Sequence, residues 1–114
     1  MADDVIYVNA AEGAKRVMNN TKLYAKLLVK FKEDPSLRQI DEALAEKDME
    51  KARSAAHTLK GLAANLSLLE LFKQVAELES QIKAGSAEDS QLELVKSVNE
   101  QTLTEIEKVI TQYA

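Results

Sequence analysis

Apolar residues recur at intervals of three and four along most of this chain, and this spacing limits its fold more than any other feature. The clearest run lies near the C-terminus, with a stripe of Leu92, Val95, Asn99, Leu103, Ile106, Ile110 and Tyr113. An α-helix returns to the same face about every 3.6 residues, so the stripe predicts an amphipathic helix. One proline and three glycines leave few turn signals for a β-sheet. We therefore expect an all-α fold.

Capping and breaking residues divide the chain into six expected helices. Four of them cover about residues 10–18, 22–33, 35–46 and 49–66. The fifth starts just after residue 67 and ends near residue 83, and the last starts at residue 86. The start signals are Asn9 with Glu12 as a capping box, Asn19-Asn20-Thr21, Asp34 as N-cap before Pro35, Asp48, and Ser67 with Glu70 as a second capping box. Asn65, in a left-handed conformation, and Gly85 are the expected stop signals.

The lengths of these helices and of their connections predict the architecture. Four of the helices are long and the connections are short, so consecutive helices should pack as antiparallel neighbours. We expect a single domain over residues 1–114: an antiparallel four-helix bundle with one or two additional short N-terminal helices.

Charge and composition exclude several classes of function. The net charge is −4 and no cluster of lysine and arginine occurs, so no nucleic-acid partner is expected. One histidine and no cysteine make a dedicated transition-metal site improbable and exclude disulfides. The acidic start, Met1-Ala2-Asp3-Asp4, is unlike a signal peptide, and no apolar run has membrane-spanning length. We expect a cytoplasmic protein that does not bind membranes.

The single histidine, His57, lies in the stretch from Arg53 to Leu66. On a helical wheel, Arg53, Lys60, Gly61 and Ala64 fall within about 60° of His57. The aliphatic residues of the same stretch fall on the opposite side, so we expect His57 to point into solvent. The carboxylates of Glu77, Glu79, Glu105 and Glu107 are assigned to solvated helix faces.

The neighbours of His57 suggest phosphoryl transfer. A neutral imidazole is a competent nucleophile toward an activated phosphoryl group, and Lys60 supplies a cation for its oxygens. Gly61 lies in mid-helix, where glycine costs about 1 kcal/mol relative to alanine, and leaves space for another molecule beside the ring. No Gly-rich loop, Walker motif or Mg²⁺ carboxylate cluster is present, so the chain is expected to be a phosphocarrier and not an enzyme. The predicted docking surface comprises Arg53, Ala56, Gly61, Ala64 and Leu68.

These residues lead to a known family. His57-Thr58-Leu59-Lys60-Gly61, with Ala55-Ala56 before it and Leu66 and Leu78-Glu79 after it, resembles the histidine-containing phosphotransfer (HPt) domain. Glu12-Gly13-x-x-Arg16 and Leu23-Tyr24-x-x-Leu27-Leu28-x-x-Phe31 also resemble its N-terminal region. The family usually has Gly-Ala after the leucine at 66, where this chain has Ser67-Leu68. We expect the Ser67/Glu70 capping box to replace the glycine.

The resemblance implies that His57 accepts a phosphoryl group from the aspartyl phosphate of a receiver domain and passes it to another receiver. It also implies that Lys60 contacts the phosphoryl oxygens and that Gly61 leaves room for the receiver. The expected partners are response-regulator receiver domains, a hybrid histidine kinase, or both. The chain itself is expected to be a monomer. The chain should need no cofactor of its own, with Mg²⁺ coming from the receiver.

Two other functions remain open. The first is a phosphorylation-independent helical adaptor, which binds receiver domains through an apolar face around His57. The second is the dimerisation and phosphoacceptor hairpin of a sensor kinase. That hairpin carries a His-Glu/Asp-Leu-x-x-Pro pattern and needs an ATP-binding domain, and both are missing from this sequence.

Overall fold

The computed structural model describes residues 5–113, and helices are the only regular elements in this range. They are α1 (Ala10–Arg16), α2 (Thr21–Phe31), α3 (Ser36–Ala45), α4 (Met49–Asn65), α5 (Leu69–Lys83) and α6 (Asp89–Tyr113). The all-α prediction is confirmed. Residues 1–4, whose acidic side chains led us to expect no signal peptide, lie outside the described residues.

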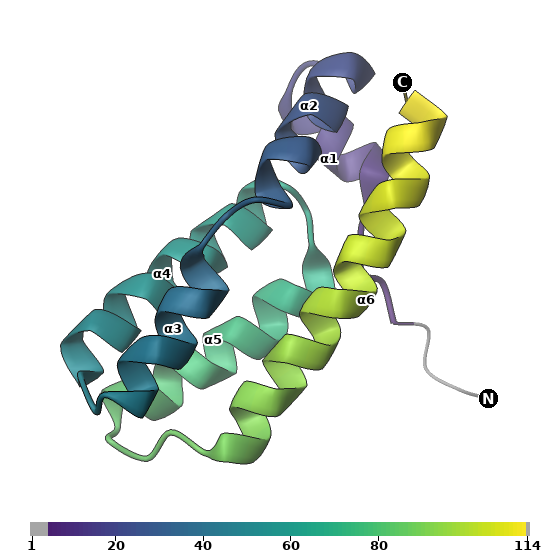
Figure 1. Cartoon of the computed structure of the whole chain (residues 1–114). Coiled ribbons are helices and arrows are strands. Elements are labelled where there is room, and N and C mark those ends of the chain that lie inside the picture. The colour runs from purple at the N-terminus through teal and green to yellow at the C-terminus, as the bar shows by residue number, and fades with distance from the viewer. Residues whose placement is uncertain (1–4, 114) are drawn as a thin grey trace.

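Helices α3 to α6 form the antiparallel four-helix bundle (Figure 1). Helix α4 packs most extensively against α3 and α5, and α5 packs in turn against α6. An ion pair of 3.1 Å between Asp41 of α3 and Lys96 of α6 closes the bundle. The predicted fold is therefore confirmed, with two helices, α1 and α2, before the bundle.

Helices α1 and α2 pack at the end of the molecule that holds the C-terminal half of α6 (Figure 1). Lys32, the residue that follows α2, forms an ion pair with Glu107 of α6. The rings of Tyr24 and Tyr113 lie 6.3 Å apart between their centroids. The hydroxyl of the fully buried Tyr24 donates a hydrogen bond of 2.6 Å to the carbonyl oxygen of Leu66, which ties α2 to the end of α4.

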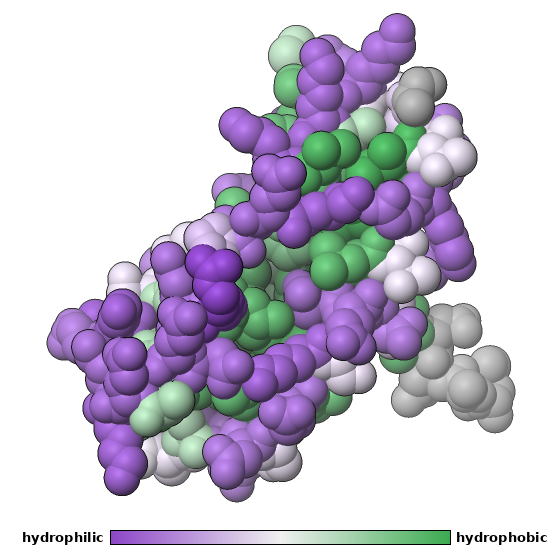
Figure 2. Space-filling view, viewed as in Figure 1, coloured by the Kyte–Doolittle hydropathy of each residue, from purple (hydrophilic) through white to green (hydrophobic). Residues whose placement is uncertain are grey.

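Aliphatic side chains fill the core. The largest fully buried aliphatic residues are Leu28, Ile40, Leu59, Leu68, Leu71, Val75, Leu78, Val95 and Ile106. Hydrophilic residues cover most of the face seen in Figure 2, and hydrophobic residues show between them in the middle of this face and beside the C-terminal half of α6. None of the helices in the described range is both long and apolar enough to cross a membrane.

Several predicted helix boundaries are confirmed. The side chains of Asn9, Asn20 and Asp48 accept hydrogen bonds from backbone N–H groups three residues later, at the starts of α1, α2 and α4. Each satisfies one of the N–H groups that the first turn of a helix leaves without a partner. Gly85 follows the end of α5 with a φ of +73°, as expected of a glycine stop signal.

Two helices begin later than predicted. Pro35 precedes α3 instead of opening it, and Asp34 Oδ1 accepts a 2.9 Å hydrogen bond from the N–H of Ser36. Helix α6 begins at Asp89 and not at Ser86. The connection is tied back to α5, because the N–H groups of Ser86 and Glu88 donate to the backbone and side-chain oxygens of Gln81.

The turn between α4 and α5 differs most from the prediction. Asn65 is the last helical residue, and the left-handed conformation belongs to Ser67, with a φ of +58°. Ser67 does not cap α5, because its Oγ donates a 2.8 Å hydrogen bond to Glu12 of α1. Neither glutamate completes its predicted capping box, because Oε1 of Glu12 accepts from Ser67 and Oε2 of Glu70 accepts from Nε2 of Gln74. The N–H of Glu70, which Ser67 was predicted to cap, donates to the carbonyl oxygen of Ile6. The N-terminal segment crosses this turn and supplies the missing partners.

Candidate functional site

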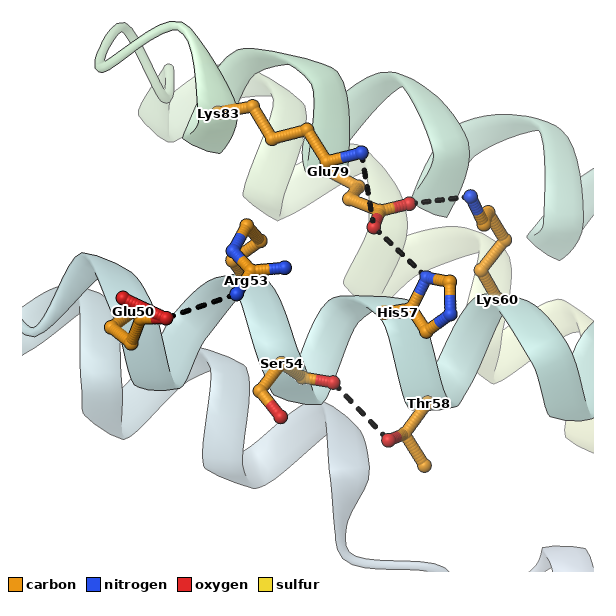
Figure 3. Close-up of polar contacts among 8 residues, drawn as sticks. All are labelled: Glu50, Arg53, Ser54, His57, Thr58, Lys60, Glu79 and Lys83. Atoms are coloured by element: carbon orange, nitrogen blue, oxygen red, sulfur yellow. Dashed lines mark hydrogen bonds and ion pairs between the residues drawn. The ribbon is translucent and has the colours of Figure 1, made fainter.

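His57 lies near the middle of α4 and points out of the bundle, with 71% of its side chain exposed (Figure 3). The opposite face of α4 is buried, with Ala52, Leu59 and Ala63 in the core. The periodicity of the helix thus separates the core-facing residues from the imidazole.

A carboxylate from the next helix holds the ring. Glu79 of α5 has only 3% of its side chain exposed, and its Oε2 lies 3.1 Å from Nδ1 of His57. A carboxylate accepts hydrogen bonds, so Nδ1 of a neutral ring carries the proton in this contact. The lone pair then lies on Nε2, at the exposed side of the ring. Glu79 therefore fixes both the orientation and the tautomer of His57.

Two lysines complete the surroundings of Glu79. Nζ of Lys60, on α4, lies 2.6 Å from Oε1, and Nζ of Lys83, on α5, lies 3.7 Å from Oε2. Burial raises the pKa of the Glu79 carboxyl, but hydrogen bonds from Lys60 and His57 and the charges of both lysines outweigh it. The pKa of Glu79 lies below its ordinary value, so the group is an anion at neutral pH.

The prediction for Glu79 is wrong, because its carboxylate is buried and not solvated. Two signals in the sequence pointed toward this role. Glu79 is part of the Leu78-Glu79 pair that the family pattern contains, and it lies four residues after the buried Val75 and three before the buried Ile82. That spacing places it at the edge of the apolar stripe of α5. Glu77 and Glu107 lie exposed, as predicted.

Lys60 and Gly61 lie where the helical wheel placed them, beside the ring. Lys60 is bound to Glu79 and is 27% exposed. A Cβ added at Gly61 would meet no other atom within 4 Å. The glycine thus relieves no clash within the protein, and the space beside it is open to another molecule.

The predicted docking surface is only partly accessible. Arg53 is half exposed and forms a 3.0 Å ion pair with Glu50, and Ala64 is half-buried. Ala56 and Leu68 are fully buried, so they cannot belong to a docking surface, and the prediction is wrong for both. Ala56 precedes His57 by about 100° of helix rotation, which turns it toward the core. Leu68 follows the left-handed Ser67 and packs in the core at the start of α5.

The arrangement supplies one nucleophile, a buried anion behind it and two cations beside it. No group of three or more histidine, aspartate or glutamate side chains with the geometry of a metal site occurs within residues 5–113. The chemistry that this chain offers by itself is attack by Nε2 on an electrophile brought by another molecule.

Comparison with known protein families gives one result that covers most of the chain. The model of a family described as the Hpt domain matches residues 26–112. This range includes His57, Lys60 and Gly61, and also Glu79 and Lys83. No curated protein and no solved structure matches the chain.

Proposed function

Because this chain belongs to the Hpt domain family, we propose that it is a histidine phosphotransfer protein of a two-component phosphorelay. His57 accepts a phosphoryl group from the aspartyl phosphate of one receiver domain and passes it to another. The observation that carries this proposal is the 71% exposed ring of His57, held at Nδ1 by the buried Glu79.

The transfer uses Nε2 as the nucleophile. Its lone pair forms a bond to phosphorus while the bond between phosphorus and the aspartyl oxygen breaks, and the aspartate leaves as a carboxylate with the electron pair. The ring keeps its proton on Nδ1 and gains a positive charge, which Glu79 stabilises across the 3.1 Å contact. The reverse reaction passes the group to a second receiver by the same path.

Lys60 and Gly61 support this step in different ways. Lys60 balances the charge of the phosphoryl oxygens once its ammonium group moves from Glu79 toward them. Gly61 allows the receiver to approach the ring, because no side chain stands in the open space beside it. Of the predicted docking residues, Gly61 is exposed and Arg53 and Ala64 are partly exposed, so these three can contact the receiver.

The partner supplies what the chain does not carry. We propose that the receiver domain, free or in a hybrid histidine kinase, brings Mg²⁺ and the acidic residues, and that this chain acts as a monomeric phosphocarrier and not as an enzyme. The absence of cysteine fits a reducing compartment, so the proposed location is the cytoplasm.

The test is transfer of radiolabelled phosphate. Receiver domains of the source organism, charged by their kinase in the presence of Mg²⁺, are mixed with the protein and with its His57→Gln variant. We expect one receiver or more to label the protein on a group that is stable in alkali and labile in acid, and the variant to stay unlabelled. Label on the variant, or binding of a receiver without any transfer, would contradict the proposal. The second result would favour an adaptor.

A further inference from the structure

One buried carboxylate is shared by two lysines that come from different helices (Figure 3). Lys60 contacts Oε1 of Glu79 closely, at 2.6 Å, and its side chain is 27% exposed. Nζ of Lys83 lies 3.7 Å from Oε2, the oxygen that Nδ1 of His57 also contacts. The side chain of Lys83 is 56% exposed. One lysine is thus held tightly and the other loosely against the same anion.

The charges show why two cations serve the site better than one. Before transfer, Glu79 contributes one negative charge and the two lysines contribute two positive ones, an excess of one. Transfer adds about two negative charges on the phosphoryl group and one positive charge on the ring. The sum is then zero with both lysines, and one negative charge remains without Lys83.

Glu79 and the phosphoryl group compete for the ammonium group of Lys60. Glu79 lies at the Nδ1 side of the ring, whereas the phosphoryl group is attached to Nε2 on the other side. Movement of the Lys60 ammonium group toward the phosphoryl oxygens would lengthen its 2.6 Å contact with Glu79. A carboxylate that is 3% exposed loses much of its stabilisation when its close cation departs.

We propose that Lys83 is a positioning residue that takes over the charge of Glu79 when Lys60 moves to the phosphoryl group. Its ammonium group already lies beside Oε2, and its high exposure leaves the side chain free to close the remaining distance. This inference rests on the proposed function, and it assigns to Lys83 an effect that acts through Glu79 and Lys60.

The experiment measures the equilibrium constant for phosphoryl transfer from a charged receiver to the protein. Lys83→Met should lower this constant roughly three- to tenfold, the worth of one charge-assisted contact near the surface. Lys83→Arg should restore it, because arginine keeps the charge. Lys73→Met, an exposed lysine on the same helix with the same change in net charge, is the matched control and should behave as the wild type. Urea denaturation identifies any variant with a weakened fold.

A double-mutant cycle separates this mechanism from direct contact of Lys83 with the phosphoryl group. In a Lys60→Met background Lys83 contacts Glu79 both before and after transfer, so Lys83→Met should lower the constant less than it does in the wild type. A full effect of Lys83→Met in that background would overturn the proposal, as would a wild-type constant in Lys83→Met or a loss that arginine does not restore. Failure of the wild type to accept any label would instead refute the proposed function.

Discussion

Oε2 of Glu79 lies 3.1 Å from Nδ1 of His57, although 22 residues separate the two along the chain. The contact exists because α4 and α5 run antiparallel and are joined by a turn of only three residues. It joins a buried anion to an exposed ring, so the reactive atom faces solvent while its orientation is set from within the bundle. The candidate site on α4 therefore depends on the contact between Glu79 and His57, and not on His57 alone.

Removal of the charge of Glu79 should weaken both activity and the fold. Glu79→Gln keeps the shape of the side chain but no longer stabilises the positive charge on the ring, so we expect transfer to His57 to slow roughly tenfold. The free energy of unfolding should fall by about 1–2 kcal/mol, because hydrogen bonds to a charged group are lost. Rapid-quench transfer assays and urea denaturation measure the two effects. Unchanged transfer would show that the contact does not serve catalysis.

The same variant gives a prediction for acid conditions. The pKa of Glu79 is lowered in the folded protein, so the stability that it contributes is present above its ordinary value of 4.5 and is lost as the pH falls through the folded value. The stability difference between the wild type and Glu79→Gln should thus be constant near neutral pH and shrink below pH 4.5. Urea titrations from neutral pH downward test this. A difference that stays constant in acid would show that the carboxylate gains nothing from its lysines.

The two helical glycines should respond in opposite ways to alanine. At Gly61 the added Cβ meets no atom within 4 Å, so Gly61→Ala should raise the free energy of unfolding by up to about 1 kcal/mol. At Gly13 the Cβ would collide with the ring of the buried Tyr24, so Gly13→Ala should lower it by about 1–3 kcal/mol. Transfer assays supply the second readout. We expect Gly61→Ala to slow transfer despite its greater stability, and normal transfer would show that the receiver does not use this space.

Tyr24 predicts a distinct response to alkali. Burial and the nearby Tyr113 and Glu12 raise the pKa of Tyr24 from 10.0 to about 12. The contribution of its neutral hydroxyl is therefore complete below pH 10 and lost as the pH rises toward 12. Tyr24→Phe loses the hydrogen bond to Leu66 and should be less stable by about 1–2 kcal/mol at neutral pH. This deficit should shrink between pH 10 and 12 in denaturation experiments, and a deficit that grows there would contradict the assignment.

The turn at Ser67 can be tested by two substitutions. A residue with a side chain at a φ of +58° costs about 1–2 kcal/mol relative to glycine, and the hydrogen bond from Oγ to Glu12 offsets part of that cost. Ser67→Ala keeps the unfavourable left-handed backbone conformation and loses the hydrogen bond to Glu12. Ser67→Gly also loses this hydrogen bond, but glycine adopts the left-handed conformation without the energetic cost. We expect the glycine variant to unfold at a higher urea concentration than the alanine variant, by about 1 kcal/mol in stability. Equal stability of the two would show that the left-handed turn carries no strain.

The sequence by itself determined the helical class, the bundle and the outward direction of His57. These properties follow from the 3.6-residue period, because the apolar stripe on α4 fixes which side faces the core and hence where His57 must point. The caps at Asn9, Asn20 and Asp48 were also readable, because a cap depends only on neighbours three residues away.

Only the tertiary structure decided what each polar side chain contacts. Glu79 faces His57 and two lysines, and Ser67 reaches Glu12 across 55 residues. Local rules assigned Glu79 to solvent and gave Ser67 a capping role, because they contain no information about which helix will lie alongside. The energy of a buried carboxylate depends on the charges that packing brings to it, and those charges come from distant parts of the chain.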